Sequence, residues 1–222
     1  MVKIVIPENF IAACENFRET VHSFYKNSKK INNNNIPNYN VHLDKVIEAT
    51  SKGLTFNNSY KSQYQPVCRF LNSCIENTPK KYKVIAEATQ KIKELLYWKV
   101  NDNYKNVYPD HFFQNESFVE IIGPSGLLIC PNIRVGFLLL GKDVFYPSHN
   151  HEALELYNII SGSSLWQIND EKFAKKSPGD EIFHDLWMPH SMKTEGQPVL
   201  ALFSWSGEIF KGSNPYKLIK YF

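Results

Sequence analysis

The chain has 222 residues, of which 43% are hydrophobic and 21% are charged, and this composition excludes a mainly disordered protein. Its formal charge is +3, from 25 Lys and Arg against 22 Asp and Glu, so charge alone indicates neither a nucleic-acid partner nor an anionic membrane surface. Aromatic residues make up 14% of the chain, which is consistent with a ring-rich core or with a pocket lined by rings.

Cysteine usage and the N-terminal segment indicate a cytoplasmic protein. The four cysteines are widely spaced, with no CxxC pair, and a chain of this length buries a core without disulfides: Cys14, Cys68, Cys74 and Cys130. The N-terminus lacks an apolar stretch of signal-peptide length, and the longest apolar run, Val135–Leu140, is far too short to span a membrane. We therefore expect neither export nor membrane insertion.

The first hundred residues show apolar residues at helical spacing. Phe10, Cys14, Phe17 and Val21 follow the i, i+4, i+7 rule, and further stripes of this kind predict about four helices before residue 100. The later stripes are centred on residues 41–47, 64–75 and 85–96. A run of Asn at 32–35, followed by Ile36, Pro37 and Asn38, predicts a loop after the first helix.

After about Asn101 the pattern changes to short β-prone runs separated by Gly, Pro and Asn. Strands are predicted over 118–122, 127–130, 134–140, 154–160, 164–168, 181–184 and 199–205. Their regular spacing predicts an antiparallel barrel or sandwich, mainly β, preceded by a helical extension. The expected division is a helical region at 1–105 and a barrel with the functional site at 106–222. There is no internal repeat and no glycine-rich phosphate loop.

The segment from Tyr146 to Tyr157 carries the residues with chemistry. His149, His151, Glu155 and Tyr157 all occupy odd positions, so on one strand they share a face, and His190 from a later strand would complete a set of three imidazoles and a carboxylate. Such a set suits a divalent metal such as Zn²⁺, Fe²⁺, Mn²⁺, Co²⁺ or Ni²⁺.

Other interpretations stay open at this point. Each His is also consistent with a hydrogen-bonded core residue, and Glu152 is an alternative carboxylate partner of His151. His184 lies six residues before His190, and we place it next to the ligands or at the solvent edge rather than among them.

Two motifs carry a resemblance. His149-x-His151-x3-Glu155, with Gly162, Pro178-Gly179-Asp180 and His190, resembles the two motifs of the cupin superfamily, a small antiparallel barrel that binds a metal in its lumen. A wider set of matches resembles the cupin-type dimethylsulfoniopropionate lyases, which also have helices ahead of the barrel: Asn132-Ile-Arg134-Val-Gly136, Tyr146-Pro-x-His149, Glu155-x-Tyr157, Pro189-His190-Ser-Met192 and Trp205-Ser-Gly207.

The resemblance implies a metal held by His149, His151, Glu155 and His190, with Tyr157 as the catalytic base and Tyr146 as a second phenol in the pocket. It also implies a small zwitterionic substrate, which is cleaved by β-elimination to acrylate and dimethyl sulfide. A sulfonium has no N–H to donate, so ring faces must recognise it, and Trp205 is the first candidate, with Met192 as a second lining residue.

The alternatives are another metal-dependent cupin enzyme, such as an Fe²⁺ dioxygenase or an isomerase, and a non-catalytic cupin that binds a small ligand. Whether the chain forms a homodimer is left open.

Overall fold

The structure is a computed structural model that describes residues 8–31, 36–105, 108–207 and 216–218. Apart from the two-residue strand β1, the strands follow the helices in the chain, and the helices have the following bounds: α1 Glu8–Ile31, α2 Pro37–Thr50, α3 Leu71–Glu76, α4 Lys83–Ile92 and α5 Asp110–Phe113. Four short 3-10 helices lie among them: η1 Pro66–Phe70, η2 Lys80–Tyr82, η3 Lys93–Leu95 and η4 Asp102–Tyr104.

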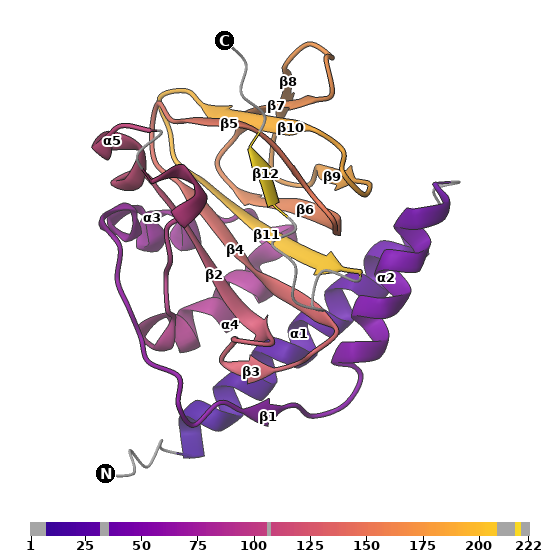
Figure 1. Cartoon of the computed structure of the whole chain (residues 1–222). Coiled ribbons are helices and arrows are strands. Elements are labelled where there is room, and N and C mark those ends of the chain that lie inside the picture. Colours follow the sequence, from indigo (N-terminus) through magenta and orange to yellow (C-terminus); the bar gives the residue numbers. More distant parts are fainter. Residues whose placement is uncertain (1–7, 32–35, 106–107, 208–215, 219–222) are drawn as a thin grey trace.

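The strands form two antiparallel layers that face each other (Figure 1). A seven-stranded sheet has the order β1-β3-β2-β4-β11-β6-β9: β1 Thr55–Phe56, β3 Leu128–Ile129, β2 Glu116–Gly123, β4 Ile133–Leu140, β11 Val199–Ser206, β6 Leu154–Ser161 and β9 Glu181–His184. A five-stranded sheet has the order β12-β5-β10-β7-β8: β12 Tyr216–Leu218, β5 Phe145–His151, β10 His190–Thr194, β7 Ser164–Ile168 and β8 Ala174–Lys176. Within these sheets only β2 and β3 pair in parallel.

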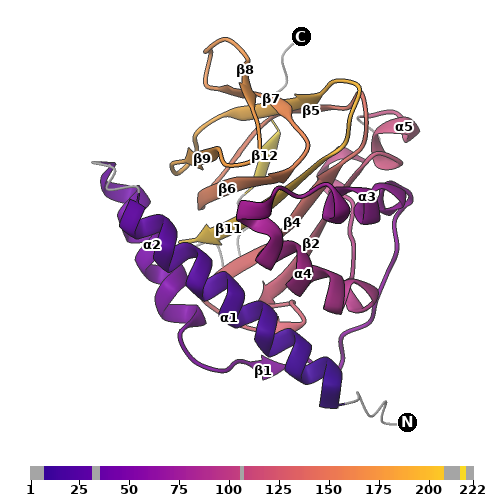
Figure 2. The same cartoon turned by 180° about the vertical axis from the view of Figure 1, so that it is seen from behind.

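Helices α1 to α4 cover one face of the seven-stranded sheet (Figure 2), and the other face of this sheet lines the barrel lumen, where Phe112 of α5 also packs. Because side chains alternate along a strand, Leu200 and Leu202 of β11 contact the helical layer, whereas Ala201 and Phe203 point into the lumen. On the helical side, α1 contributes a stripe of Cys14, Phe17 and Val21, all fully buried. These side chains and those of the sheet's outer face form one continuous core. Burial of one such side chain stabilises the fold by about 1.5–3 kcal/mol.

The predicted elements are largely confirmed. Four principal helical segments precede residue 100, although the stripe predicted at 64–75 begins with the 3-10 helix η1 before α3. The predicted loop is only partly observed, because residues 32–35 lie outside the described part of the chain and Pro37 already begins α2. Proline is favoured at the first position of a helix, because an N–H at this position would have no partner within the helix.

Strand β5 contains a proline. Pro147 would interrupt a regular strand between Tyr146 and His149, but β5 runs continuously through it. The pairing with β10 shifts at this point, so that His190 lies opposite His149 and Met192 lies opposite Tyr146. Two residues of β5 therefore face a single residue of β10, and at such a bulge the proline needs no N–H for the ladder.

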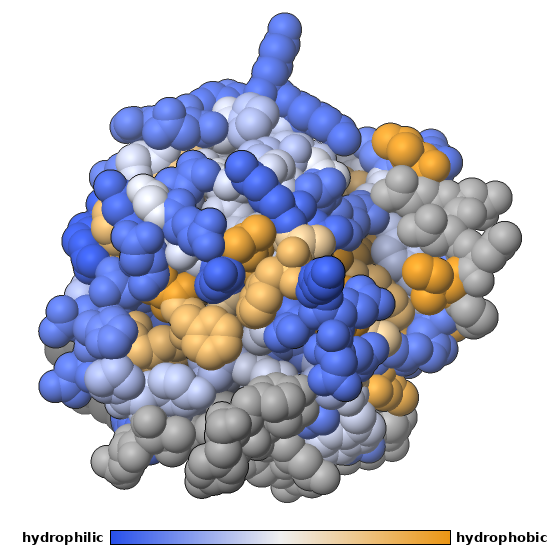
Figure 3. Space-filling view, turned by 90° about the horizontal axis from the view of Figure 1, so that it is seen from above, coloured by the Kyte–Doolittle hydropathy of each residue, from blue (hydrophilic) through white to orange (hydrophobic). Residues whose placement is uncertain are grey.

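The surface above the five-stranded sheet is largely hydrophilic, with a small hydrophobic area near its centre (Figure 3). None of the described helices combines the length and the apolar character that crossing a lipid bilayer requires. The main architecture, a β-barrel with helices contributed by the N-terminal half, agrees with the expectation from the sequence.

Candidate metal centre

Strands of both sheets bring four potential ligands together. β5 supplies His149 and His151 and β10 supplies His190, so these three lie on the five-stranded sheet, whereas Glu155 lies on β6 of the other sheet. The expectation that the odd-numbered residues share one face of a single strand is wrong, because the chain turns at Glu152 and Ala153. The histidines and the carboxylate instead meet across the lumen.

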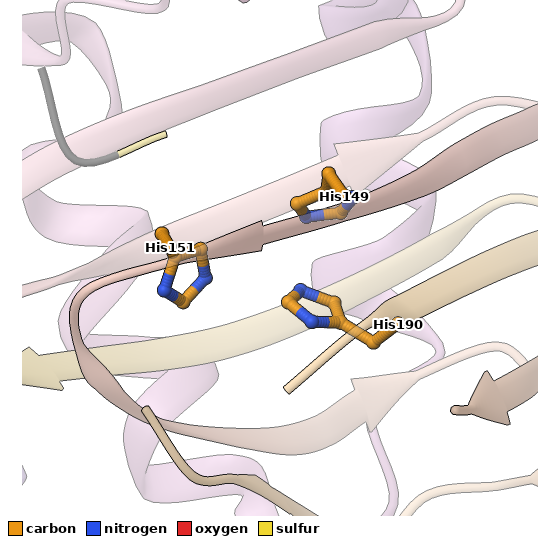
Figure 4. Close-up of side chains that lie close together, drawn as sticks. All are labelled: His149, His151 and His190. Atoms are coloured by element: carbon orange, nitrogen blue, oxygen red, sulfur yellow. The ribbon is translucent and has the colours of Figure 1, made fainter. Parts of the chain in front are cut away.

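Distances within this cluster fit a common metal ion. The three imidazoles turn toward one space (Figure 4), and one ring nitrogen of each lies within 4.8 Å of those of the others. Oε2 of Glu155 lies 3.1 Å from Nε2 of His151 and 3.3 Å from Nε2 of His190. Two ligands bonded to an ion at about 2.1 Å and at right angles lie about 3 Å apart, so these atoms are already at ligand spacing.

Backbone carbonyls set the orientation of two of the rings. The Nδ1–H of His149 donates to the carbonyl of Pro147 over 2.8 Å, and the Nδ1–H of His190 donates to that of Met188 over 2.9 Å. This tautomer directs Nε2 of each ring toward the cluster. Nε2 of His190 is buried and has no hydrogen-bond partner of good geometry in the described part of the chain, as expected for an atom that serves a metal.

The protonation states also suit a metal. Burial, helped by the neighbouring His190 and His151, holds the pKa of His149 well below its usual value, so the ring is neutral. For Glu155, burial acts to raise the pKa, but the electrostatic effect of His151, the hydrogen bonds from His151 and His184, and the nearby His190 ring outweigh it and hold the pKa well below the usual value. A neutral imidazole and a carboxylate are the forms that bind a divalent ion.

His184 lies next to the ligands, which is one of the two expected places, and does not lie at the solvent edge. It is fully buried on β9, and its Nδ1–H donates to Oε2 of Glu155 over 2.9 Å. Its ring stacks on that of His190, with centroids 3.8 Å apart and planes 14° apart. On β9, His184 and Ile182 alternate with residues that face outward. Once the strand is recognised, this alternation predicts that the His184 side chain points into the lumen.

A cavity of about 500 Å³, including its open mouth, leads to the cluster. Its walls come from five strands and from the segment before η4: Asn101, Phe118, Glu120, Arg134, Leu138, Tyr146, His149, Glu155, Tyr157, Phe203 and Trp205. Three of the four pocket residues predicted from the sequence therefore line it. The fourth, Met192, is fully buried in the lumen core and is not among the lining residues.

The two phenols have different surroundings. Tyr157 is almost fully buried, and burial together with the charge of Glu155 raises its pKa well above the ordinary value. The Tyr146 ring lies against that of His149, with centroids 4.9 Å apart. Its hydroxyl oxygen accepts a hydrogen bond from Nδ2 of Asn101 over 3.2 Å.

Trp205 contacts the cluster through its ring edge and its ring plane. Its Nε1–H donates to Oε1 of Glu155, and its ring packs against that of His151, with centroids 4.3 Å apart. The guanidinium carbon of Arg134 lies 5.6 Å from the Trp205 ring centroid.

Sequence reasoning assigned no role to three charged or polar residues of the cavity. Nε of Arg134 lies 3.1 Å from Oε2 of Glu120, and Oε1 of Glu120 accepts the backbone N–H of Ser125 over 2.7 Å. The alternation along β2 and β4 places both side chains in the lumen, whereas the position of Asn101 follows from no local pattern.

The comparisons with known proteins point to one family. The dimethylsulfoniopropionate lyase family model matches residues 39–201. The dimethylsulfoniopropionate lyase DddQ of Ruegeria pomeroyi is 24% identical over 65% of this chain and 71% of its own length. A putative dimethylsulfoniopropionate lyase DddL of Cereibacter sphaeroides is 27% identical over 55% of this chain, which spans about half of that relative.

Solved structures agree at the level of the fold. A structure from the study titled "Crystal structures of DMSP lyases RdDddP and RnDddQII" matches with a TM-score of 0.71 and 21% identity, over 94% of this chain and 98% of the other. The crystal structure of DddQ from Ruegeria pomeroyi matches with a TM-score of 0.66 and 22% identity, over 75% of this chain and 82% of the other. With most of its length matched by the family model, the chain belongs to the dimethylsulfoniopropionate lyase family, a group of carbon–sulfur lyases with the cupin fold.

Proposed function

We propose that this chain cleaves dimethylsulfoniopropionate by β-elimination at a metal centre formed by His149, His151, Glu155 and His190, with Tyr157 as the base. The observation that carries the proposal is the buried cluster of imidazoles and a carboxylate at ligand spacing, which opens onto a cavity next to two phenols. A divalent ion there would act as a Lewis acid on the substrate carboxylate, and its charge would favour the phenolate form of Tyr157.

The reaction needs a base next to the carbon that carries the acidic hydrogen. Tyr157 takes that proton from the carbon beside the carboxylate, the electrons of the broken C–H bond form the C=C bond, and the C–S bond breaks. Acrylate and dimethyl sulfide leave, and the proton on Tyr157 returns to solvent. Because Tyr157 is two residues from Glu155 and lines the same cavity, it lies on the ligand side of β6.

The remaining pocket residues bind and orient the substrate. Tyr146, whose oxygen is held by Asn101, contacts the carboxylate end next to His149. The ring face of Trp205 contacts the dimethylsulfonium group, because a sulfonium interacts with an aromatic face as a quaternary ammonium does. Met192 supports the lumen wall behind Tyr146, its partner in the β5–β10 pairing.

Three imidazoles and a carboxylate do not select one metal, because Fe²⁺, Zn²⁺, Mn²⁺, Co²⁺ and Ni²⁺ all bind such ligands.

The four cysteines are free and buried, which fits a chain that works in the cytoplasm.

One assay tests the proposal. Protein loaded separately with each metal and given dimethylsulfoniopropionate should release dimethyl sulfide into the headspace, and a chelator should stop the release. Tyr157→Phe should keep the metal and lower kcat by about 100-fold or more, as expected when a general base is removed. Tyr64→Phe is the matched control, because the Tyr64 hydroxyl lies at the surface and bonds only a local carbonyl among described residues.

Two results would contradict the proposal. An active Tyr157→Phe variant would remove Tyr157 from the role of base. Oxygen consumption without dimethyl sulfide, or ligand binding without any turnover, would favour the dioxygenase or the non-catalytic alternative.

A further inference from the structure

Helix α2 packs on the outer face of the seven-stranded sheet, behind the metal centre (Figure 2). Polar side chains at three positions of this helix, Asn38, Tyr39 and His42, bond to or next to two strands that carry hydrogen-bond donors to Glu155. These strands are β11, with Trp205, and β9, with His184.

His42 of α2 holds β11 on both sides of Trp205. It is fully buried, with Nε2 at 2.7 Å from Oγ of Ser204 and Nδ1 at 2.8 Å from Oγ of Ser206. Because side chains alternate along the strand, the two serines face the helix and Trp205 between them points into the lumen. The backbone that carries the indole is thus fixed from behind at both neighbouring residues.

The chemistry of His42 suits this bridging contact. Burial lowers its pKa to about 3, so the ring is neutral and presents one N–H donor and one acceptor. A serine hydroxyl donates and accepts, so both ring nitrogens are satisfied whichever tautomer is present. A buried imidazole with two hydroxyl partners holds its neighbours more firmly than apolar packing alone, since breaking either bond leaves a polar atom unpaired.

The same helix holds β9 on both sides of His184. The Tyr39 hydroxyl donates to Oε2 of Glu181 over 2.5 Å, and Nδ2 of Asn38 lies 2.9 Å from each carboxylate oxygen of Asp185. Glu181 begins β9 and Asp185 directly follows His184. His184 is therefore held between two anchored positions, as Trp205 is on β11.

Trp205 and His184 reach opposite oxygens of the same carboxylate. The indole N–H donates to Oε1 of Glu155, whereas Nδ1–H of His184 donates to Oε2. In the sheet these residues form one cross-strand row, because Glu155 pairs with Trp205 on one side and with His184 on the other. The two donors together fix the rotation of the carboxylate and hence the direction of its lone pairs.

We propose that α2 positions the metal-binding carboxylate, with His42 acting through Trp205, and Asn38 and Tyr39 acting through His184. The proposal rests on the metal centre proposed above and assigns a role in the site to the helical extension. Hydrogen-bond partners of a metal ligand orient it, and removing one typically weakens metal binding about 10- to 100-fold.

The test measures metal affinity and metal geometry rather than turnover. Full-length variants are titrated with Co²⁺ against a chromophoric chelator, and the visible absorption of bound Co²⁺ reports the ligand geometry. His42→Leu, which keeps much of the volume but makes no hydrogen bond, should weaken Co²⁺ binding by about 10-fold or more and change the absorption band. His42→Gln, which retains a donor and an acceptor, should restore much of both.

A matched control separates positioning from general loss of stability. His22 lies on α1 and bonds the carbonyl of Ile47 over 3.1 Å, so this hydrogen bond joins α1 to α2 rather than α2 to a strand. His22→Gln should leave Co²⁺ affinity and absorption as in the wild-type protein. Should His42→Leu fail to fold, Ser206→Ala removes one of the two contacts from the strand side and should weaken Co²⁺ binding by a smaller factor.

Folded variants that bind Co²⁺ with wild-type affinity and absorption would overturn the proposal. Wild-type protein that binds Co²⁺ but releases no dimethyl sulfide would contradict the lyase function and leave the role of α2 intact. Wild-type protein that binds none of the candidate metals would overturn both.

Discussion

Glu116, at the first position of β2, is a fully buried acid outside the metal centre. Its Oε2 accepts the backbone N–H of Asn101 over a long 3.4 Å, and its Oε1 has no hydrogen-bond partner among the described residues. Burial therefore raises its pKa to about 8, against a small opposing effect of the Asn101 N–H. Asn101 in turn bonds Tyr146, so a neutral Glu116 supports the segment that reaches the cavity.

The buried acid gives stability a specific pH dependence. In the unfolded chain Glu116 ionises near its ordinary pKa of 4.5, whereas in the fold it holds its proton to about 8, so stability falls as pH rises between these values. Burial lowers the pKa values of His42 and His184 to about 3. These two histidines therefore change the free energy of unfolding only below about pH 6.5, where they gain protons in the unfolded chain. Between pH 6.5 and 8 we expect a loss of about 2 kcal/mol in the free energy of unfolding, at most about 1.4 kcal/mol per pH unit.

Urea unfolding at pH 6.5, 7.25 and 8 measures this loss, and Glu116→Gln should abolish most of it. Glu87→Gln, which changes an exposed carboxyl on α4, should keep the wild-type slope. Equal slopes in the wild type and in Glu116→Gln would show that Glu116 does not carry the effect.

Single residues were predictable where their partners are near in sequence or follow a strand pattern. The spacing of His149, His151 and Glu155 was sufficient to propose a ligand set. The partners of His42 lie more than 160 residues away, and the Asn101 contact to Tyr146 spans 45 residues. Such contacts depend on the order of strands and on how the helices pack, and no local pattern contains that information.

Among the elements, β2 and β4 approach each other closely at Gly136. A Cβ on Gly136 would lie 1.7 Å from the carbonyl oxygen of Val119, a backbone atom that has no room to move. The pairing between these strands shifts near Glu120 and Ile122, which brings the two backbones together. Only glycine fits this position, and Arg134 at the cavity lies two residues before it.

Gly136→Ala should therefore destabilise the fold by about 3 kcal/mol, at the upper end for overpacking of a core. Gly53→Ala is the matched control, because a Cβ there would meet only the flexible side chain of Glu15 at 3.7 Å. Thermal unfolding of the two variants beside the wild type measures the difference, and a Gly136→Ala variant as stable as Gly53→Ala would contradict the assigned close approach.

The boundaries of regular strands were predicted well, and those of irregular strands were not. The runs at 164–168 and 181–184 agree residue by residue with β7 and β9, because they show clear β-prone composition between turn signals. β5 contains histidine, proline and serine and β10 contains histidine and serine, and neither is among the strand ranges predicted from the sequence. Their histidines belong to the proposed metal centre and Pro147 lies at a bulge, and such residues reduce the ordinary strand signal.

At the scale of the whole molecule, the proposed metal centre joins the two sheets. His149, His151 and His190 come from one sheet and Glu155 comes from the other, so an ion bound to all four links the layers. A ligand that binds only the folded state stabilises it according to its concentration. We expect metal to raise the melting temperature as well as to support turnover.

Metal at 100 times its dissociation constant should stabilise the protein by about 2.7 kcal/mol. For a domain of this size that corresponds to a rise of about 5–10 °C in Tm. His190→Ala should lose this rise, while His111→Ala, at an exposed position of α5, should retain it. Differential scanning calorimetry with and without a chelator tests the expectation, and an equal rise in both variants would show that the ion binds elsewhere.

The order of strands also has a consequence for how the newly made chain folds. β11 lies between β4 and β6, although it follows both of them in the chain by many residues. Until residues 199–206 have been synthesised, no strand can fill the position between β4 and β6. Glu155 then also lacks the hydrogen bond from the indole of Trp205. Since non-local pairings of this kind form late, we expect nascent chains that end before residue 199 to capture no metal, so that maturation follows completion of the barrel.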